Sequence, residues 1–518
     1  MNKYLKDIFI HLDGIAMAPI YEFLSNNNNI LSKGIRNGVF RLEYREDGEN
    51  HNLNRAYCSV LSKILQAQNI IEQPSLTDNY GKYYSLTDYG KDIFNNNSNY
   101  SGFKDYYISS ISLIEGKATL NNSNFVKNFK TAYLAYLNSI DKNGIESLIS
   151  KHLEGSLIGP ILIYCEYTDS NKNNEIYSLE NDLQDFIIKN GMLENGGLTE
   201  KGKYLLSKSY AYGVTDSYMK TFIHLETLCT DSQSNGISNK IDKNKNEYHV
   251  DRSLNVWGSG NSHTTYFKHI DKYVIDIFNK PLEKQPKGIA DMGCGDGAFL
   301  YHLNELIKSK TLRGKYLDSH PLLLIGADFN QAALDSTQAM FSNNNNKPIT
   351  VLADISKPDI YAKEIFSNHS LNISDFLNVR SFLDHNRRFN SAVKSSDSNK
   401  YAFKNITTNC FSWKGDLIKA QDTQIDLVEH FKKWKKYISK YGLLVLELHS
   451  IDIDDIYPSI GKIPMTAYLA THGFSDQFII EYEVYKECLL LAGLNIDARY
   501  EKIFPNQETK MISINLIS

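Results

Sequence analysis

The pattern of apolar and polar positions divides the chain into two parts of different character. After about residue 250, short apolar runs alternate with helical stretches, which is typical of an α/β domain with a mostly parallel sheet. The apolar runs read KGIADMG, LLLIGAD, PITVLAD, SDFLNVRSFL, GLLVLELHS and MISINLIS. Because parallel sheets bind ligands at the carboxyl ends of their strands, we expect the functional site at that edge.

The first part is mainly helical in pattern and contains a local repeat. The segments SLTDYGK and GLTEKGK each follow an apolar helix and a turn, and each leads into another apolar helix. Thr87 and Thr199 are suited to cap the second helix of each copy. Helix, hairpin and capped helix make a winged-helix-like layout. We therefore expect winged-helix-like regions at 1–110 and at 111–250, the second including a lid and a linker, and an α/β core at 251–518.

Composition narrows the class of protein. The chain has 518 residues, too many for a single core. Its net charge of -4 does not favour a broad nucleic-acid surface. The six cysteines form no C-x-x-C pair, so we expect reduced thiols. Asp7 and His11 interrupt the N-terminal apolar stretch, which argues against a signal or membrane segment. A cytoplasmic protein is expected.

The segment GIADMGCGDGAFL has the glycines of a nucleotide-binding loop. It matches the dinucleotide pattern G-x-G-x-x-A, and it also matches D-x-G-x-G-x-G, with Asp291 followed by Gly293, Gly295 and Gly297. A dinucleotide loop wraps a pyrophosphate, which Asp291 and Asp296 would repel. Two acids suit a cation, and S-adenosylmethionine carries an ammonium and a sulfonium but no phosphate.

Acids also end the next two strands, at Asp328 and Asp354. This ordered set resembles the class I S-adenosylmethionine-dependent methyltransferases, whose fold is a Rossmann-like α/β core. The resemblance implies that Asp291 and the three glycines hold the methionine part of the cofactor. It further implies that Asp328 binds the ribose and that Asp354 with Ile355 frames the adenine. Phe329 would complete the cofactor-binding set.

Three stretches at the same edge are rich in polar and charged side chains. RSFLDHNRRF offers Asp384, His385 and Arg387 as catalytic candidates. LELHS ends in His449, and ATHGFSDQF contains His472 and Gln477. The last three residues could supply neutral ligands to one octahedral iron or manganese ion. Each also has a structural interpretation, as a buried core histidine, a helix cap or a surface amide, and His385 could act as a base without a metal.

The motifs GSGNSHTTYF, SFLDHNR, LELHS and HGFSDQ resemble the methyltransferases of polyketide synthase loading modules, of the apratoxin and saxitoxin type. That resemblance implies a mononuclear iron or manganese, here on His449, His472 and Gln477, with His263 closing over the site; Asp384 or His385 could also belong to the ligand set. It implies C-methylation of a malonyl-type acyl thioester. No carrier-domain serine motif occurs in the chain, so the expected substrate is carried by a separate acyl carrier protein or by coenzyme A, or is a free β-dicarbonyl acid.

Two other functions are compatible with the sequence. One is a small-molecule O-methyltransferase, in which a histidine serves as general base and the N-terminal half forms a homodimer. The other is a DNA-binding protein that senses S-adenosylmethionine through its core. Metal content separates the first from the metal-assisted enzyme, and salt-dependent DNA binding would reveal the second.

Overall fold

The computed structural model describes residues 3–26, 31, 34, 39–41, 53–78, 81–94, 100–168, 172–238, 240–241, 247–391 and 400–518. The chain forms two compact units, and neither is continuous in sequence. The helical unit comprises residues 1–261, 409–418 and 452–477, and the sheet unit comprises residues 262–408, 419–451 and 478–518. The domain boundaries expected from the sequence stay a prediction.

The sheet unit is built on seven strands in the order β13-β14-β12-β9-β6-β7-β8. The strands are β6 (Gly288–Met292), β7 (Leu323–Asp328), β8 (Ile349–Leu352), β9 (Leu377–Ser381), β12 (Leu443–Leu448), β13 (Lys502–Phe504) and β14 (Ile512–Ile517). The first five in the chain run parallel, and β14 is antiparallel to β12. The expected α/β fold with a mostly parallel sheet is confirmed. Strand β13 was not predicted, because three residues are too few to give an apolar run.

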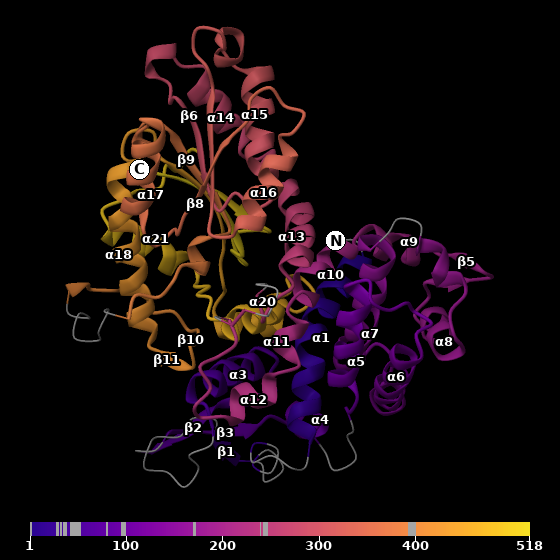
Figure 1. The fold of residues 1–518 in the computed structure, drawn as a ribbon. Coiled ribbons are helices and arrows are strands. Elements are labelled where there is room, and N and C mark those ends of the chain that lie inside the picture. The colour runs from indigo at the N-terminus through magenta and orange to yellow at the C-terminus, as the bar shows by residue number, and fades with distance from the viewer. Residues whose placement is uncertain are drawn as a thin grey trace. The chain divides into compact units, whose positions relative to one another are not determined.

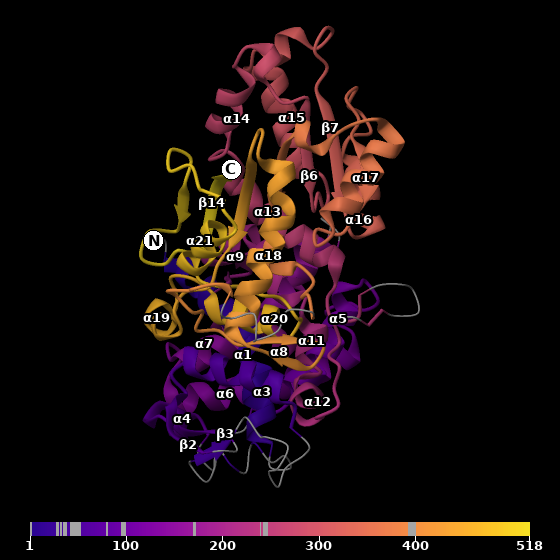
Figure 2. The same ribbon diagram turned by 90° about the vertical axis from the view of Figure 1, so that its left-hand side faces the viewer.

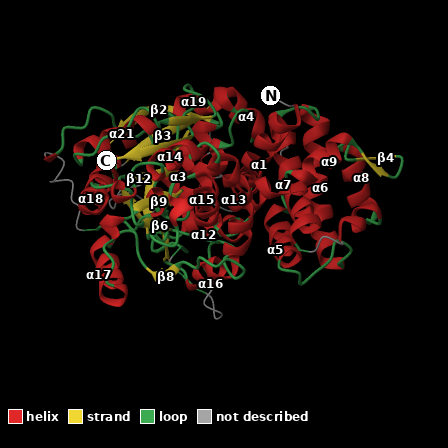
Figure 3. Ribbon diagram, turned by 90° about the horizontal axis from the view of Figure 1, so that it is seen from above, coloured by secondary structure: helices red, strands yellow, loops and turns green. Residues whose placement is uncertain are grey.

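Helices cover both faces of this sheet (Figures 1 and 3). One face carries α14 (Asp271–Phe278), α15 (Ala298–Lys310) and α16 (Gln331–Met340); the other carries α17 (Pro358–His369), α18 (Ala420–Ile438) and α21 (Tyr482–Leu491). Apolar side chains of α14 and α15 pack with inward residues of five strands, including Ile289, Leu324 and Val379. Since both faces are buried, the strands read as continuous apolar runs in the sequence.

The helical unit contains the helices from α1 to α12 and the first part of α13. Their bounds are α1 (Lys3–Ser25), α3 (Arg55–Ala67), α4 (Asp88–Ile93), α5 (Phe103–Ile114), α6 (Ser123–Asn143), α7 (Leu148–Tyr167), α8 (Asn181–Lys189), α9 (Glu200–Ser207), α10 (Ser209–Asp216), α11 (Met219–Phe222), α12 (Leu225–Thr230) and α13 (Arg252–Phe267). The last of these continues into the sheet unit. The later segments add a hairpin and two helices: β10 (Phe411–Trp413), β11 (Asp416–Ile418), α19 (Ile453–Ile456) and α20 (Met465–Gly473).

The centre of the helical unit is the crossing of α1 and α7, which lie side by side (Figure 2). Gly14 and Gly155 allow the two backbones to touch: a Cβ atom on Gly14 would lie 2.2 Å from the His152 carbonyl oxygen. Ser156 Oγ donates to the Gly14 carbonyl at 2.7 Å. By length and composition α1 passes for a membrane-spanning helix, but 83% of its most apolar stretch is buried within the structure.

Buried polar groups also line this crossing. Glu154 is 1% exposed and lies 3.0 Å from Lys151 Nζ, 3.2 Å from Lys201 Nζ and 3.5 Å from His11 Nε2. His11 in turn shares a hydrogen bond of 2.7 Å with the Tyr212 hydroxyl. One buried carboxylate therefore contacts two lysines and a histidine.

The two copies of the local repeat share the same helix cap, although their hairpins differ in length. Thr87 caps α4 by accepting a hydrogen bond from the Gly90 N–H, and Thr199 caps α9 by accepting one from the Gly202 N–H. The capped helices follow the hairpins β2–β3 (Ile71–Asp78, Gly81–Leu86) and β4–β5 (Leu193–Glu194, Gly197–Leu198). The two predicted caps are confirmed, while the winged-helix assignment stays a prediction.

Two later chain segments complete the helical unit. Thr466 Oγ1, at the start of α20, accepts a hydrogen bond of 2.7 Å from Gln68 Nε2. The Ala467 N–H donates to Asp13 Oδ1 at 2.8 Å, and Asp476 accepts from the Tyr57 hydroxyl and from Ser412. Residues from opposite ends of the sequence therefore share one core.

We expect the helical unit to lose stability in mild acid because of His152. This side chain is fully buried, and burial lowers its pKa to about 3, with a smaller contribution from His11. A histidine in the unfolded chain has a pKa near 6.5. Between pH 6.5 and pH 3, His152 is therefore protonated in the unfolded chain and neutral in the folded chain. The contribution is complete above pH 6.5 and is lost as the pH falls from there toward 3, by about 1.4 kcal/mol per pH unit.

Urea unfolding between pH 7.5 and pH 5 measures this effect. Substitution of His152 by Asn should make the fall in unfolding free energy shallower by roughly 2 kcal/mol over that interval. Replacement of the exposed His369 by Asn is the matched control and should leave the pH dependence as it is. Equal slopes for the wild type and the His152 variant would contradict the burial argument.

Candidate active site

The sheet order fixes where a ligand can enter the sheet unit. Strand β6 has β7 on one side and β9 on the other, so the direction of winding reverses there. Such a reversal opens a crevice at the carboxyl ends of the strands. The loop after β6 and the turn after β9 meet at this point, because a Cβ on Gly293 would lie 2.7 Å from the Leu383 side chain.

The loop after β6 is shaped by its glycines. Gly293, Gly295 and Gly297 have φ angles of 81°, 56° and 82°, the left-handed region that glycine enters without strain. The Gly293 N–H is hydrogen-bonded to the Ala327 carbonyl at 2.7 Å, which fixes the loop on β7. Among the described residues, apart from its chain neighbours, no heavy atom lies within 4 Å of a Cβ built on Gly295. The loop is thus anchored at its start and open at its middle.

Asp291, in β6 beneath this loop, is 1% exposed, and neither of its carboxylate oxygens has a hydrogen-bond partner among the described residues. Burial, with the charges of Asp328 and Asp296, raises its pKa well above the usual range. A buried carboxyl group without a partner is costly. A cationic or hydrogen-donating ligand would remove that cost, so Asp291 fits the ammonium group of S-adenosylmethionine.

The acids after β7 and β8 are held in place by backbone donors. Asp328 accepts hydrogen bonds from the Gly295 N–H at 3.1 Å and from the Asn330 N–H at 2.9 Å. Asp354 accepts from the Ser356 N–H at 2.9 Å. Phe329 is 63% exposed, and the Ile355 carbonyl accepts a hydrogen bond from the Trp434 indole. All the predicted cofactor residues therefore lie along one edge of the sheet.

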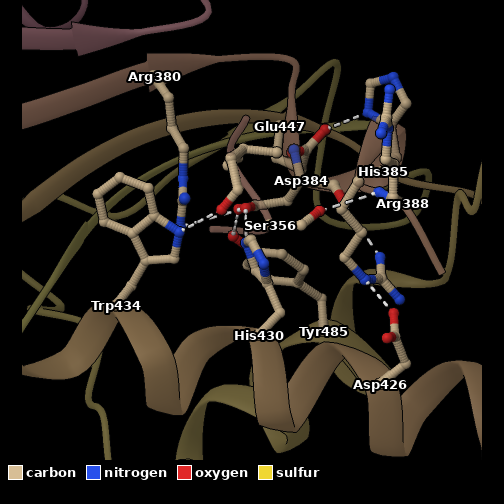
Figure 4. A network of polar contacts seen from close by, with 12 residues as sticks. Ser356, Arg380, Asp384, His385, Arg388, Asp426, His430, Trp434, Glu447 and Tyr485 are labelled. Carbon is tan, nitrogen blue, oxygen red and sulfur yellow. Dashed lines mark hydrogen bonds and ion pairs between the residues drawn. The ribbon is translucent and has the colours of Figure 1, made fainter. Parts of the chain in front are cut away.

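The turn after β9 brings a histidine onto a carboxylate (Figure 4). His385 Nδ1 lies 2.5 Å from Glu447 Oε1, and the other oxygen of Glu447 accepts the Asp384 N–H at 2.7 Å. Glu447 belongs to β12 and is 1% exposed. A carboxylate on Nδ1 orients the ring and stabilises its protonated form, as in the histidine–carboxylate pairs of enzymes that use a histidine base. Sequence reasoning missed Glu447, whose signal was a lone acid inside an apolar strand.

Asp384 is tied into a buried network (Figure 4). Burial alone would raise its pKa, but Arg380 at 3.1 Å and the hydrogen bonds from His430 and Tyr485 lower it. Arg380 is itself fully buried, 5.2 Å from the centre of the Trp434 ring. These contacts hold the turn rigidly beside β12.

Arg387 braces the other side of the same turn. Its guanidinium lies 2.7 Å from Asp426 on α18 and also donates to the carbonyls of Asp384 and Thr423. Asp384 and Arg387 are thus both committed to contacts within the protein, and a direct catalytic role for either stays a prediction. The side chain of His263, in α13, lies outside the described residues.

The three side chains predicted to bind a metal do not form a set within either unit. His449 belongs to the sheet unit, where its Nε2 pairs with Ser513 Oγ at 2.7 Å and its ring packs on Tyr482 and Tyr485. His472 and Gln477 belong to the helical unit. Within the described ranges no three His, Cys, Asp or Glu side chains are grouped so that they could hold an ion. These positions do not fit a metal within one unit.

The sheet topology, the glycine loop and the acids at successive strand ends define a class I S-adenosylmethionine-dependent methyltransferase. Residues 247–515, more than half of the chain, match the family model described as the AprA MT2-like domain. The chain belongs to this methyltransferase family. Among proteins of curated function, none matches it in sequence.

Solved structures of several methyltransferases are similar in fold. The mitomycin 7-O-methyltransferase MmcR is 9% identical with a TM-score of 0.26, over 51% of this chain and 56% of that chain, so only about half of that relative is spanned. The neocarzinostatin O-methyltransferase NcsB1 is 13% identical, with a TM-score of 0.35, over 67% and 87%. Human N-acetylserotonin methyltransferase is 10% identical, with a TM-score of 0.35, over 76% and 95%.

Proposed function

We propose that this methyltransferase alkylates the acidic carbon of a malonyl-type acyl thioester, presented by an acyl carrier protein or coenzyme A, with His385 as general base. The observation that carries the proposal is the contact of 2.5 Å between His385 Nδ1 and Glu447 Oε1 at the carboxyl edge of the sheet. The AprA MT2-like family match supports methyl transfer, and the resemblance to the loading-module methyltransferases suggests a substrate of this class.

The chemistry follows from the position of the dyad. Bound S-adenosylmethionine would supply the methyl group as an electrophilic sulfonium. His385 Nε2 removes a proton from the carbon between two carbonyls, and the carbanion takes the methyl group while the sulfur keeps the electron pair of the broken bond. Glu447 stabilises the imidazolium that forms. The proton then passes to solvent, which restores the base.

The cofactor part of the proposal predicts a measurable loss at Asp328. An Asn at this position keeps the shape but loses the charge that would accept both ribose hydroxyls. A hydrogen bond to a charged group contributes about 1.5–3 kcal/mol, so the dissociation constant for S-adenosylhomocysteine should rise by about 10- to 150-fold. Calorimetric titration measures it. Asp335→Asn, on the exposed side of α16, is the control, and an unchanged affinity in Asp328→Asn would contradict this assignment.

An O-methyltransferase is the second candidate, because the same dyad can deprotonate a hydroxyl group. The two are separated by the position of the label after reaction with methyl-deuterated S-adenosylmethionine. A labelled methyl on carbon in a malonyl thioester supports the proposal, and a label found only on oxygen in phenolic acceptors refutes it.

Metal assistance stays a prediction from the resemblance to loading-module methyltransferases. No step above depends on a metal. Nε2 of His449 pairs with Ser513 Oγ, and His449 lies in a different unit from His472 and Gln477. Elemental analysis of the purified chain measures its iron and manganese content. About one equivalent, lost in Gln477→Ala, would support the predicted ligands.

A further inference from the structure

Arg388 extends from the turn that carries His385 toward the predicted adenine site. Its guanidinium centre lies 4.6 Å from the centroid of the Phe329 ring. Its Nη1 atom lies 3.8 Å from Asp354 Oδ2, and its backbone N–H donates to Ser356 Oγ at 3.1 Å (Figure 4). Three contacts therefore join Arg388 to the segments after β7 and β8.

These contacts reach across the sheet edge. Arg388 follows β9, whereas Phe329 and Asp354 follow β7 and β8, and the sheet order is β9-β6-β7-β8. Neighbouring strands lie about 4.8 Å apart, so the span from β9 to β8 is about 14 Å. The end of β6, with the glycine loop, lies between them. The contacts of Arg388 with Phe329, Asp354 and Ser356 thus cross the crevice above the end of β6; we call them the bridge.

The bridge is built on a rigid base. Arg387 ties the turn to α18 through Asp426, and Asp384 ties it to Arg380, both in buried contacts. Arg388 itself is different, since its side chain is 52% exposed and its ion pair is long. The side chain of Arg388 can move while the turn stays fixed.

The Phe329 ring is the apolar surface on which a base would stack. Phe329 is 63% exposed, which is unusual because phenylalanine side chains are more often buried. Stacked rings lie with centroids about 4.5 Å apart or more, and the guanidinium at 4.6 Å occupies that position. A purine cannot stack on this face until Arg388 leaves.

We propose that Arg388 is a gate that competes with the adenine of the cofactor for the face of Phe329. The inference rests on the proposed binding of S-adenosylmethionine at this edge and adds the residue that limits how fast the cofactor enters. The closed state is held by a cation–π contact and by the weak ion pair with Asp354. Cofactor entry requires both to break, and neither needs to re-form for the cofactor to leave.

The test is the rate of binding of S-adenosylhomocysteine, measured by stopped-flow fluorescence, to the full chain and to Arg388→Met. Methionine keeps an unbranched side chain and removes the charge. The association rate constant should rise about fivefold, equivalent to about 1 kcal/mol, and the dissociation rate constant should stay within about twofold. Arg499→Met is the matched control, because Arg499 is 77% exposed and pairs only locally with Asp497.

Salt provides a second readout. Raising the ionic strength screens the exposed pair of Arg388 and Asp354, so the wild type should associate faster with added salt and Arg388→Met should not. Equal association rates in the wild type and the variant overturn the gate. A weaker affinity in Arg388→Met also overturns it, because Arg388 would then hold the cofactor. A wild type that binds no S-adenosylhomocysteine refutes the proposed function itself, an outcome distinct from the other two.

Discussion

Replacing His385 with alanine is expected to lower kcat for methyl transfer by about 10²–10⁴-fold, the usual contribution of a positioned general base. The loss follows from the geometry of the dyad, in which Glu447 contacts Nδ1 and orients the imidazole ring. Affinity for S-adenosylhomocysteine should stay within about threefold, because no cofactor contact is assigned to His385. Initial rates with labelled S-adenosylmethionine and calorimetric titration together measure the two quantities.

Two further variants sharpen this test. Glu447→Gln keeps a hydrogen-bond acceptor but removes the charge that stabilises the imidazolium, so its kcat should fall less than that of His385→Ala. His369→Ala, at the exposed end of α17, should have wild-type activity. A His385→Ala enzyme that keeps most of its kcat would exclude the base assignment.

Replacing Glu154 with alanine is expected to lower the unfolding free energy by about 3–5 kcal/mol, as when one partner of a buried ion pair is removed. Lys151, Lys201 and His11 would then lose the buried carboxylate that they share. The largely exposed Glu146, 3.8 Å from Lys151 Nζ, would remain beside Lys151. These neighbours hold the pKa of Glu154 below its usual range although burial alone would raise it. Its contribution is therefore present above about pH 4.5 and is lost as the pH falls further.

Urea unfolding followed by far-ultraviolet circular dichroism at pH 7 measures the loss. Lys203→Ala removes an exposed pair with Glu200 and should change the unfolding free energy by no more than about 1 kcal/mol. A Glu154→Ala variant within 1 kcal/mol of the wild type would show that water reaches this part of the core. Removal of Glu154 would then have changed the unfolding free energy little.

The sheet and its edge were predictable because their signals are local. Each parallel strand is a short apolar run, and the acids at Asp291, Asp328 and Asp354 lie in or directly after such runs. The order of strands in the sheet turns these positions along the chain into neighbours in space. Thr87 and Thr199 were predictable for the same reason, since a cap depends on residues three positions away.

The partners of His385 and Arg388 were not predictable from one sequence. Glu447 lies 62 residues from His385, and Phe329 and Asp354 come from two other strand ends. No periodicity links such positions; only the folded sheet brings them together. The division between the units was hidden for a related reason, because an apolar pattern does not reveal that residues 452–477, with His472 and Gln477, belong to the helical unit whereas His449 belongs to the sheet unit. The predicted metal ligands stay a prediction.

Because each unit is built from separate chain segments, the fold also limits when the helical unit can complete its folding during synthesis. Gln68 pairs with Thr466, 398 residues later, and Asp13 with Ala467, 454 residues later. The earliest helices therefore meet these partners only when most of the chain has been synthesised. The helical unit cannot be completed during synthesis before the five parallel strands of the sheet have been made. A fragment ending near residue 250 would expose the surfaces of α1 and α3 that α20 covers. Separately expressed halves would therefore need each other to reach the native state.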